Sequence, residues 1–151
     1  MKKLILIVVL LGVILGVILG VTGCQVSNTG ISDIKISNPD DVSFFVKEET
    51  LKNTGATLVL ENNSDKLLRY DEVYEIEVKK DDKWHKINVE LYFNEPLWGV
   101  NPKSKDEIDL NWEYGYGKLT PGEYRIIKEV FFEFDSVQEP EFYIAAEFVI
   151  E

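Results

Sequence analysis

The chain has 151 residues, enough for one ordinary domain, and its 16 basic and 27 acidic residues give a formal net charge of −11. Nucleic-acid binding needs basic patches, so this balance argues against a nucleic-acid partner. The single cysteine, Cys24, excludes an intrachain disulfide.

Residues 1–23 have the layout of a bacterial secretory signal, which predicts an N-terminal signal helix outside the fold. Lys2 and Lys3 form a basic start, and residues 4–21 are an uninterrupted apolar run, counting glycine. The run leads into an apolar residue, two small residues and a cysteine. This order resembles the lipobox of bacterial lipoproteins, with Val21, Thr22 and Gly23 before Cys24.

The lipobox resemblance implies a lipid anchor. In that family the cysteine thiol receives a diacylglycerol, and the signal is cleaved just before it. Membrane lipid would then be a partner through acylated Cys24, on the extracytoplasmic face of the cell membrane. The alternative is an uncleaved anchor, since the run is just long enough to span a bilayer. Gly12, Gly16 and Gly20 also have the spacing of a close helix–helix contact.

The part of the chain that follows the signal is more acidic than the whole. Only Lys2 and Lys3 are charged before Cys24, so the remainder has 14 basic and 27 acidic residues and a net charge of −13. This charge argues against adsorption to anionic headgroups, so a lipid would have to hold the protein there. Residues 24–41 are rich in serine, asparagine, aspartate and glycine and predict a flexible tether. The folded domain is predicted over 42–151.

Apolar residues alternate with polar ones through most of this domain, which is typical of half-buried strands. The predicted strands are 42–48, 56–62, 73–80, 105–113, 123–132 and 141–151, with a weaker one at 83–89. Turn residues separate them at 53–55, 62–66, 81–83, 101–104 and 119–122, and residues 90–100 are irregular. The pattern predicts an all-β fold, an immunoglobulin-like antiparallel two-sheet sandwich of about seven to eight strands.

The sequence LTPGEY at 119–124 predicts the corner between two strands. Proline presets one turn residue and glycine suits the next, so Leu119, Pro121 and Gly122 lead into a strand that begins at Tyr124. A buried tyrosine at this place donates its hydroxyl to a nearby backbone group and joins the sheets, as a tyrosine corner.

The stretches TGATLVLENNSDK, DDKWHKI and YGKLTPGEYRIIK resemble a family of bacterial immunoglobulin-like domains found in exported lipoproteins of Bacillus-type bacteria. The resemblance covers about 43–150. It implies a fold and a place on the outer face of a Gram-positive membrane, and no activity. A weaker likeness joins the chain to intracellular proteinase inhibitors of bacilli, although a lipoprotein signal conflicts with that location.

No catalytic residue, metal site or cofactor is predicted. His85 is the sole histidine, and without cysteine partners it favours neither a metal site nor a catalytic triad. Acidic neighbours on a strand point to opposite faces rather than across a cleft. The glycines near 115–122 lack the G-K-[ST] of a phosphate-binding loop. We therefore predict that the protein is not an enzyme.

Three aromatic residues are candidates for contact with a partner. Trp98 falls in an irregular stretch, and Tyr114 and Tyr116 flank Gly115. The alternative is that all three cover the ends of the sandwich. The sequence thus predicts a non-enzymatic binding or structural role at the cell envelope, with an unknown protein or envelope partner. The alternatives are a proteinase inhibitor with 94–102 as its bait loop, and an envelope carbohydrate- or metal-binding module.

Overall fold

The computed structural model describes residues 28–94 and 96–151. The predicted signal helix, Cys24 and the lipobox residues Val21, Thr22 and Gly23 lie outside the described residues. Within them, no helix has the length and apolar character needed to cross a membrane.

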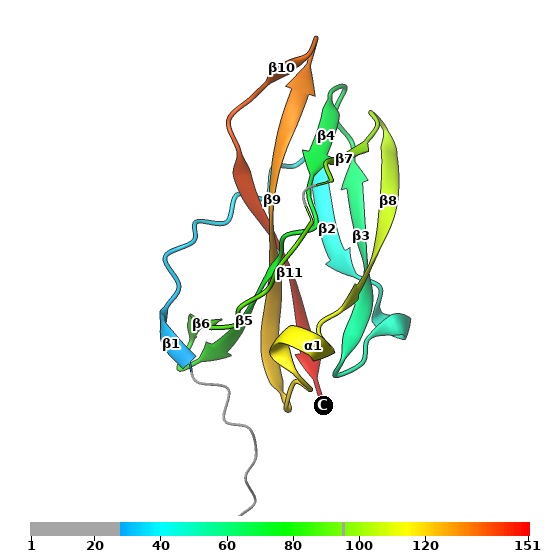
Figure 1. Cartoon of the computed structure of the whole chain (residues 1–151). Coiled ribbons are helices and arrows are strands. Elements are labelled where there is room, and N and C mark those ends of the chain that lie inside the picture. The colour runs from blue at the N-terminus through cyan, green and yellow to red at the C-terminus, as the bar shows by residue number, and fades with distance from the viewer. Residues whose placement is uncertain (1–27, 95) are drawn as a thin grey trace, which may run out of the picture.

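The fold consists of two antiparallel sheets packed face to face (Figure 1). The smaller sheet has the order β2-β3-β8 and is formed by β2 (Val42–Val46), β3 (Gly55–Asn62) and β8 (Ser104–Asn111). A short 3₁₀ turn, η1 (Glu48–Thr50), connects β2 to β3. In this sheet, β2 and β8 are the two marginal strands, and Figure 1 shows no strand beyond β8.

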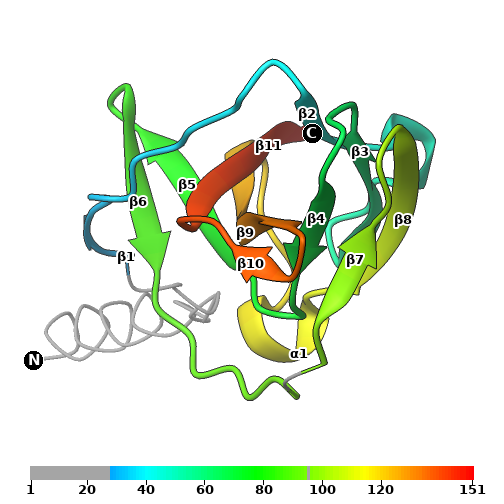
Figure 2. The ribbon, with the colours of Figure 1, turned by 90° about the horizontal axis from the view of Figure 1, so that it is seen from above.

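The larger sheet is built around β9 (Gly122–Phe134), which pairs along one side with β11 (Phe142–Ile150). Its other side pairs with two successive strands, β4 (Leu67–Tyr70) at one end and β5 (Glu75–Lys80) at the other. The sheet is completed by β1 (Asn28–Ile31), β6 (Lys83–Ile87), β7 (Trp98–Val100) and β10 (Val137–Gln138). Figure 2 looks down on the sandwich, with β1 and β6 at one end and β8 at the other.

The core lies between the sheets because alternate residues of each strand point inward. Trp112 is fully buried, its ring lies 5.6 Å from that of Phe148, and its indole nitrogen donates to the carbonyl of Asn53 at 2.9 Å. Asn62 connects the two sheets, since its amide donates to the carbonyls of Lys66 and Val100 at 2.8 and 2.9 Å. The predicted all-β antiparallel two-sheet sandwich is confirmed.

Several elements differ from the sequence-based expectation. The predicted tether contains β1, which pairs with β6, and the irregular stretch 90–100 contains β7, which pairs with β4. Strand β8 ends at Asn111, and a single helical turn, α1 (Glu113–Tyr116), follows it. The weak strand at 83–89 was correctly placed, because β6 pairs with β5 across Asp81 and Asp82, both at positive φ.

The corner before β9 has the geometry that its sequence suggests. The hydroxyl of Tyr124 donates to the carbonyl of Thr120 at 2.8 Å, which is the hydrogen bond that a tyrosine corner requires. Leu119 is buried, and its N–H donates to the carbonyl of Asn53 at 2.9 Å. A Cβ at Gly122 would lie 3.3 Å from the Tyr124 ring, so the missing side chain lets the ring pack against the backbone.

Candidate functional site

A groove of about 560 Å³ opens between the sheets beside β8. One wall is β8 itself, from Asp106 to Asn111, and the other wall comes from β4, β7, α1 and the segment between β6 and β7. We call it the β8 groove. Its lining residues are Tyr70, Asp71, Glu72, Tyr74, Leu91, Tyr92, Phe93, Trp98, residues 106–111, Tyr114, Gly115 and Lys128.

Exposed aromatic side chains gather around this groove. Trp98 on β7 is 49% exposed and Tyr114 on α1 is 99% exposed, and both line the groove. Tyr92 joins them with 94% exposure, although sequence reasoning did not single it out. The signal that could have found Tyr92 was its position in the same irregular stretch as Trp98. The groove therefore gathers exposed aromatic side chains from the segment before β7, from β7 and from α1.

Tyr116 does not belong to this exposed set, and the prediction of a partner contact for it is wrong. It is only 5% exposed, and its hydroxyl accepts a hydrogen bond from the Ile76 N–H at 3.0 Å. Burial also raises the pKa of this phenol. The physical reason lies in α1, because a helical turn places residues two apart on different sides. Tyr114 thus faces solvent while Tyr116 fills the core.

The β8 groove is rich in carboxylates. Asp106 accepts a hydrogen bond from the Tyr70 hydroxyl at 2.5 Å, and Asp71, Glu72 and Asp109 also line the groove. Burial and the Asp106 carboxylate together raise the pKa of Tyr70, so this phenol stays neutral and donates. The groove therefore presents negative charge next to apolar and aromatic surface.

Lys128 is a buried cation at the base of the same groove. Its ammonium donates to the carbonyls of Asp71 and Val73 at 2.7 and 2.9 Å, and it lies 5.5 Å from the Tyr70 ring centroid. Burial lowers the pKa of Lys128 to about 8. Because the two carbonyls lie in the break between β4 and β5, Lys128 stabilises that break. Two of its three N–H donors are thus used within the fold.

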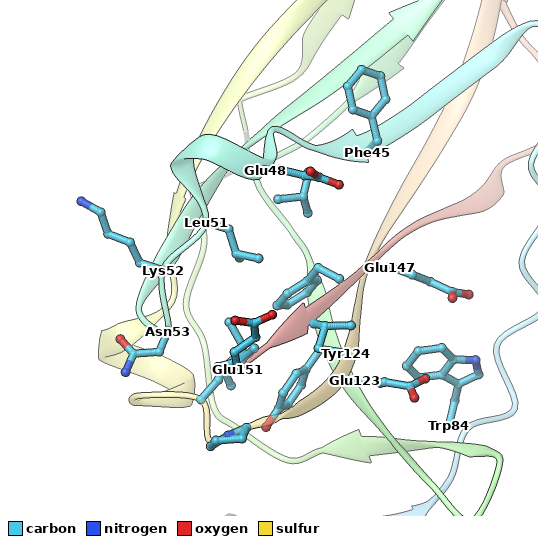
Figure 3. Close-up of a pocket in the computed structure, with 16 residues that line it drawn as sticks. Phe45, Glu48, Leu51, Lys52, Asn53, Trp84, Glu123, Tyr124, Glu147 and Glu151 are labelled. Atoms are coloured by element: carbon cyan, nitrogen blue, oxygen red, sulfur yellow. The ribbon is translucent and has the colours of Figure 1, made fainter.

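A second hollow, of about 960 Å³, lies between β2 and β11 (Figure 3). Figure 3 shows Glu48, Leu51 and Lys52 on the side of β2, and Trp84, Glu123 and Glu147 on the opposite side. The Trp84 ring is covered on one face by the Arg125 guanidinium, 4.6 Å from its centroid. Most of its apolar lining belongs to core residues, so this hollow is an open seam between the sheets.

A buried ion pair on the larger sheet was missed by the sequence reasoning. Arg125 donates through Nε to Glu77 at 2.8 Å, and both side chains are buried although alternation places them away from the core. Trp84 covers Arg125, and the Ser32 hydroxyl lies 3.5 Å from it. One carboxylate oxygen of Glu77 has no partner among the described residues. The pair has a structural role, since it joins β5 to β9.

The described residues hold no group of three or more His, Cys, Asp or Glu side chains arranged to bind a metal ion. His85 is half-buried on β6, where it is paired in register with Val78. The suggested bait loop at 94–102 includes β7, whose residues are paired with β4, so that part is held in the sheet.

Comparison with known proteins gives a single finding. A family model described as a bacterial Ig-like domain matches residues 38–148, which is most of the chain. No curated protein and no solved structure matches the sequence significantly.

Proposed function

Since the chain belongs to the bacterial Ig-like domain family, which indicates a structural or binding module, we propose that it is a non-enzymatic binding protein of the cell envelope. Its partner docks in the β8 groove. The tyrosine corner and Lys128 make hydrogen bonds within the fold. The surface that we assign to the partner is therefore the exposed wall of the β8 groove.

The observation that carries this proposal is the convergence of Tyr92, Trp98 and Tyr114. They come from the segment before β7, from β7 itself and from α1, all three are exposed, and all three line one groove. Exposed apolar surface that is gathered in one place marks interaction sites, and aromatic side chains are the usual anchors of protein interfaces. The carboxylates of the groove also make this surface negatively charged, which favours positively charged partners.

The binding role is tested by retention on envelope fractions. The full-length chain in detergent micelles is passed over immobilised cell-wall and membrane fractions, alongside a Trp98→Ala/Tyr114→Ala variant. Retention should fall about tenfold or more, because anchor residues dominate interface energy. Phe134→Ala is the matched control, since Phe134 is 53% exposed and lies outside the groove. Equal retention of all three proteins would contradict the proposal.

We further propose that acylated Cys24 holds the domain on the extracytoplasmic face of the membrane. The support is the lipobox-like sequence VTGC after a basic start and an apolar run. Cys24→Ser should abolish labelling with a radioactive fatty acid and should block cleavage of the signal. Unchanged processing and localisation of Cys24→Ser would favour the uncleaved anchor instead.

A further inference from the structure

Strand β8 has one side that no other strand of the described residues covers. It ends the order β2-β3-β8, and its neighbour β3 takes only one of its two sides. The N–H of Trp112 donates to the Thr54 carbonyl at 3.0 Å, in line with the β3–β8 register. In an antiparallel ladder such bonds recur at every second residue, so the even-numbered residues of β8 bond to β3.

The odd-numbered residues of β8 therefore direct their backbone groups away from β3. These are Lys105, Glu107, Asp109 and Asn111. The N–H of Glu107 donates a hydrogen bond to the carboxylate of Asp106 at 3.0 Å. Among the described residues, the N–H groups of Asp109 and Asn111 have no such partner on this side. A row of backbone donors and acceptors at a sheet margin is a template for another strand.

The side chains of β8 alternate between two environments beside this free side. Ile108 and Leu110 are half-buried and line the β8 groove, whereas Glu107 and Asp109 are exposed on the outer face of the smaller sheet. A strand added along β8 would continue both faces. Its inward side chains would enter the groove beside Leu91 and Phe93, and its outward side chains would stand next to Glu107 and Asp109.

We propose that β8 accepts an extended segment of a partner as an additional strand, and that this segment alternates apolar and basic side chains. The proposal rests on the proposed binding function of the β8 groove and specifies its ligand class. Main-chain hydrogen bonds to β8 supply affinity, and the alternating side chains supply specificity, as in other cases of strand addition. Tyr92, Trp98 and Tyr114 form the opposite rim and contact the added strand there.

Charge decides which kind of strand fits. Opposite charges directly across a strand pair stabilise it, and like charges destabilise it. Glu107 already pairs with Lys47 at 3.1 Å, whereas Asp109 is in no ion pair of the described residues, so Asp109 above all favours lysine or arginine opposite it. Two copies of this chain joined through β8 would bring these carboxylates against each other, so self-pairing is disfavoured. An acidic surface with net charge −11 for the whole chain also attracts a basic segment over a distance.

In the larger sheet, the open side of β11 is partly covered by a segment of the same chain. The Ser37 N–H donates to the Tyr143 carbonyl of β11 at 2.7 Å, and the Asn38 side chain accepts from the Ala145 N–H at 3.3 Å. Segment 36–38 thus occupies the side of β11 that β9 leaves open. No described segment does this for β8, and the free side of β8 is the one that adjoins the exposed aromatic residues.

The test uses hydrogen exchange on the full-length chain in detergent micelles. The probe is a blocked octapeptide, (Lys-Val)₄, which matches the eight residues of β8. Exchange at the amides of Asp109 and Asn111 should slow about tenfold or more on binding, because new backbone hydrogen bonds protect them. Two further peptides serve as controls: (Glu-Val)₄, which has the opposite charge, and (Lys-Val)₄ with N-methylated lysines, which loses backbone donors.

A variant pair gives a second measurement. Asp109→Lys should weaken (Lys-Val)₄ binding about tenfold or more, whereas Glu147→Lys, the same charge change on β11, should leave it unchanged. Equal protection by the acidic peptide overturns the proposal, and so does peptide binding without slower exchange at Asp109 and Asn111. If no peptide binds while Trp98→Ala/Tyr114→Ala still reduces envelope retention, strand addition is wrong and the proposed function stands. The N-methylated peptide is tested on the original chain, so the proposal can still be tested if Asp109→Lys folds poorly.

Discussion

At the scale of single residues, the tyrosine corner gives a direct test of the fold. Tyr124 is buried, and its hydroxyl donates to the Thr120 carbonyl at 2.8 Å. Tyr124→Phe removes this donor but keeps the ring, which packs 5.7 Å from the Phe148 ring. We expect the free energy of unfolding to fall by about 1–2 kcal/mol, because the carbonyl loses its partner. Chemical denaturation measures the change.

The matched control is Tyr114→Phe, because the Tyr114 side chain is exposed and outside the core. Its free energy of unfolding should equal that of the original chain. A neutral Tyr124→Phe would show that the hydroxyl contributes nothing at the corner.

How well single residues were predicted depended on how local their environment is. Leu119, Gly122 and Tyr124 were identified because their roles follow from six adjacent residues. Glu77 and Arg125 were missed because alternation assigns both to the solvent side, where Trp84 and Ser32 cover the pair. Those covering residues are distant in sequence, and no local pattern predicts that they cover the pair. Lys128 was missed for the same reason, since its carbonyl partners at Asp71 and Val73 come from another strand break.

At the scale of elements, strands of five or more residues were predictable and shorter ones were not. Strands β3, β8, β9 and β11 have eight or more residues, and their period-two pattern is strong. Strands β1 and β7 have four and three residues, which is too short for an alternation of apolar and polar residues to be recognised. Both exist because a neighbouring strand offers backbone partners, which is a tertiary effect. The candidate groove was therefore unpredictable as a whole, because its wall includes β7.

The Glu77–Arg125 pair tests how β5 is held on β9. Arg125→Met removes the cation and leaves a buried carboxylate, one of whose oxygens already has no partner among the described residues. We expect the free energy of unfolding to fall by about 3–5 kcal/mol, as for other broken buried pairs. The double variant Glu77→Leu/Arg125→Met removes both charges and should recover most of the loss.

Thermal or chemical denaturation of the original chain, Glu77→Leu, Arg125→Met and the double variant gives the coupling energy. If Arg125→Met and the double variant are equally destabilised, then Arg125 contributes through its packing against Trp84 rather than through its charge.

At the scale of the whole molecule, the excess of acidic over basic side chains acts against the stability of the fold. No disulfide joins the sheets, since Cys24 is the only cysteine. The two sheets therefore depend on packing and on polar contacts such as those of Asn62. The acidic excess lowers stability through self-repulsion while keeping copies of the protein apart. The same charge that opposes self-association through β8 thus also weakens the domain.

This balance predicts an unusual response to salt. Raising NaCl from about 20 mM to about 300 mM shortens the screening length several-fold and reduces the repulsion. The midpoint of thermal unfolding should then rise by about 2–5 °C, which corresponds to about 0.5–1 kcal/mol for a domain of this size. The surface ion pairs, such as Lys79–Glu123, oppose the rise only weakly, because exposed pairs contribute little. Neutralising three exposed carboxylates that take part in no ion pair of the described residues (Asp40→Asn, Glu90→Gln and Glu151→Gln) should raise the low-salt midpoint and flatten the slope. A midpoint that falls with salt in both proteins would mean that attractive pairs outweigh the net charge.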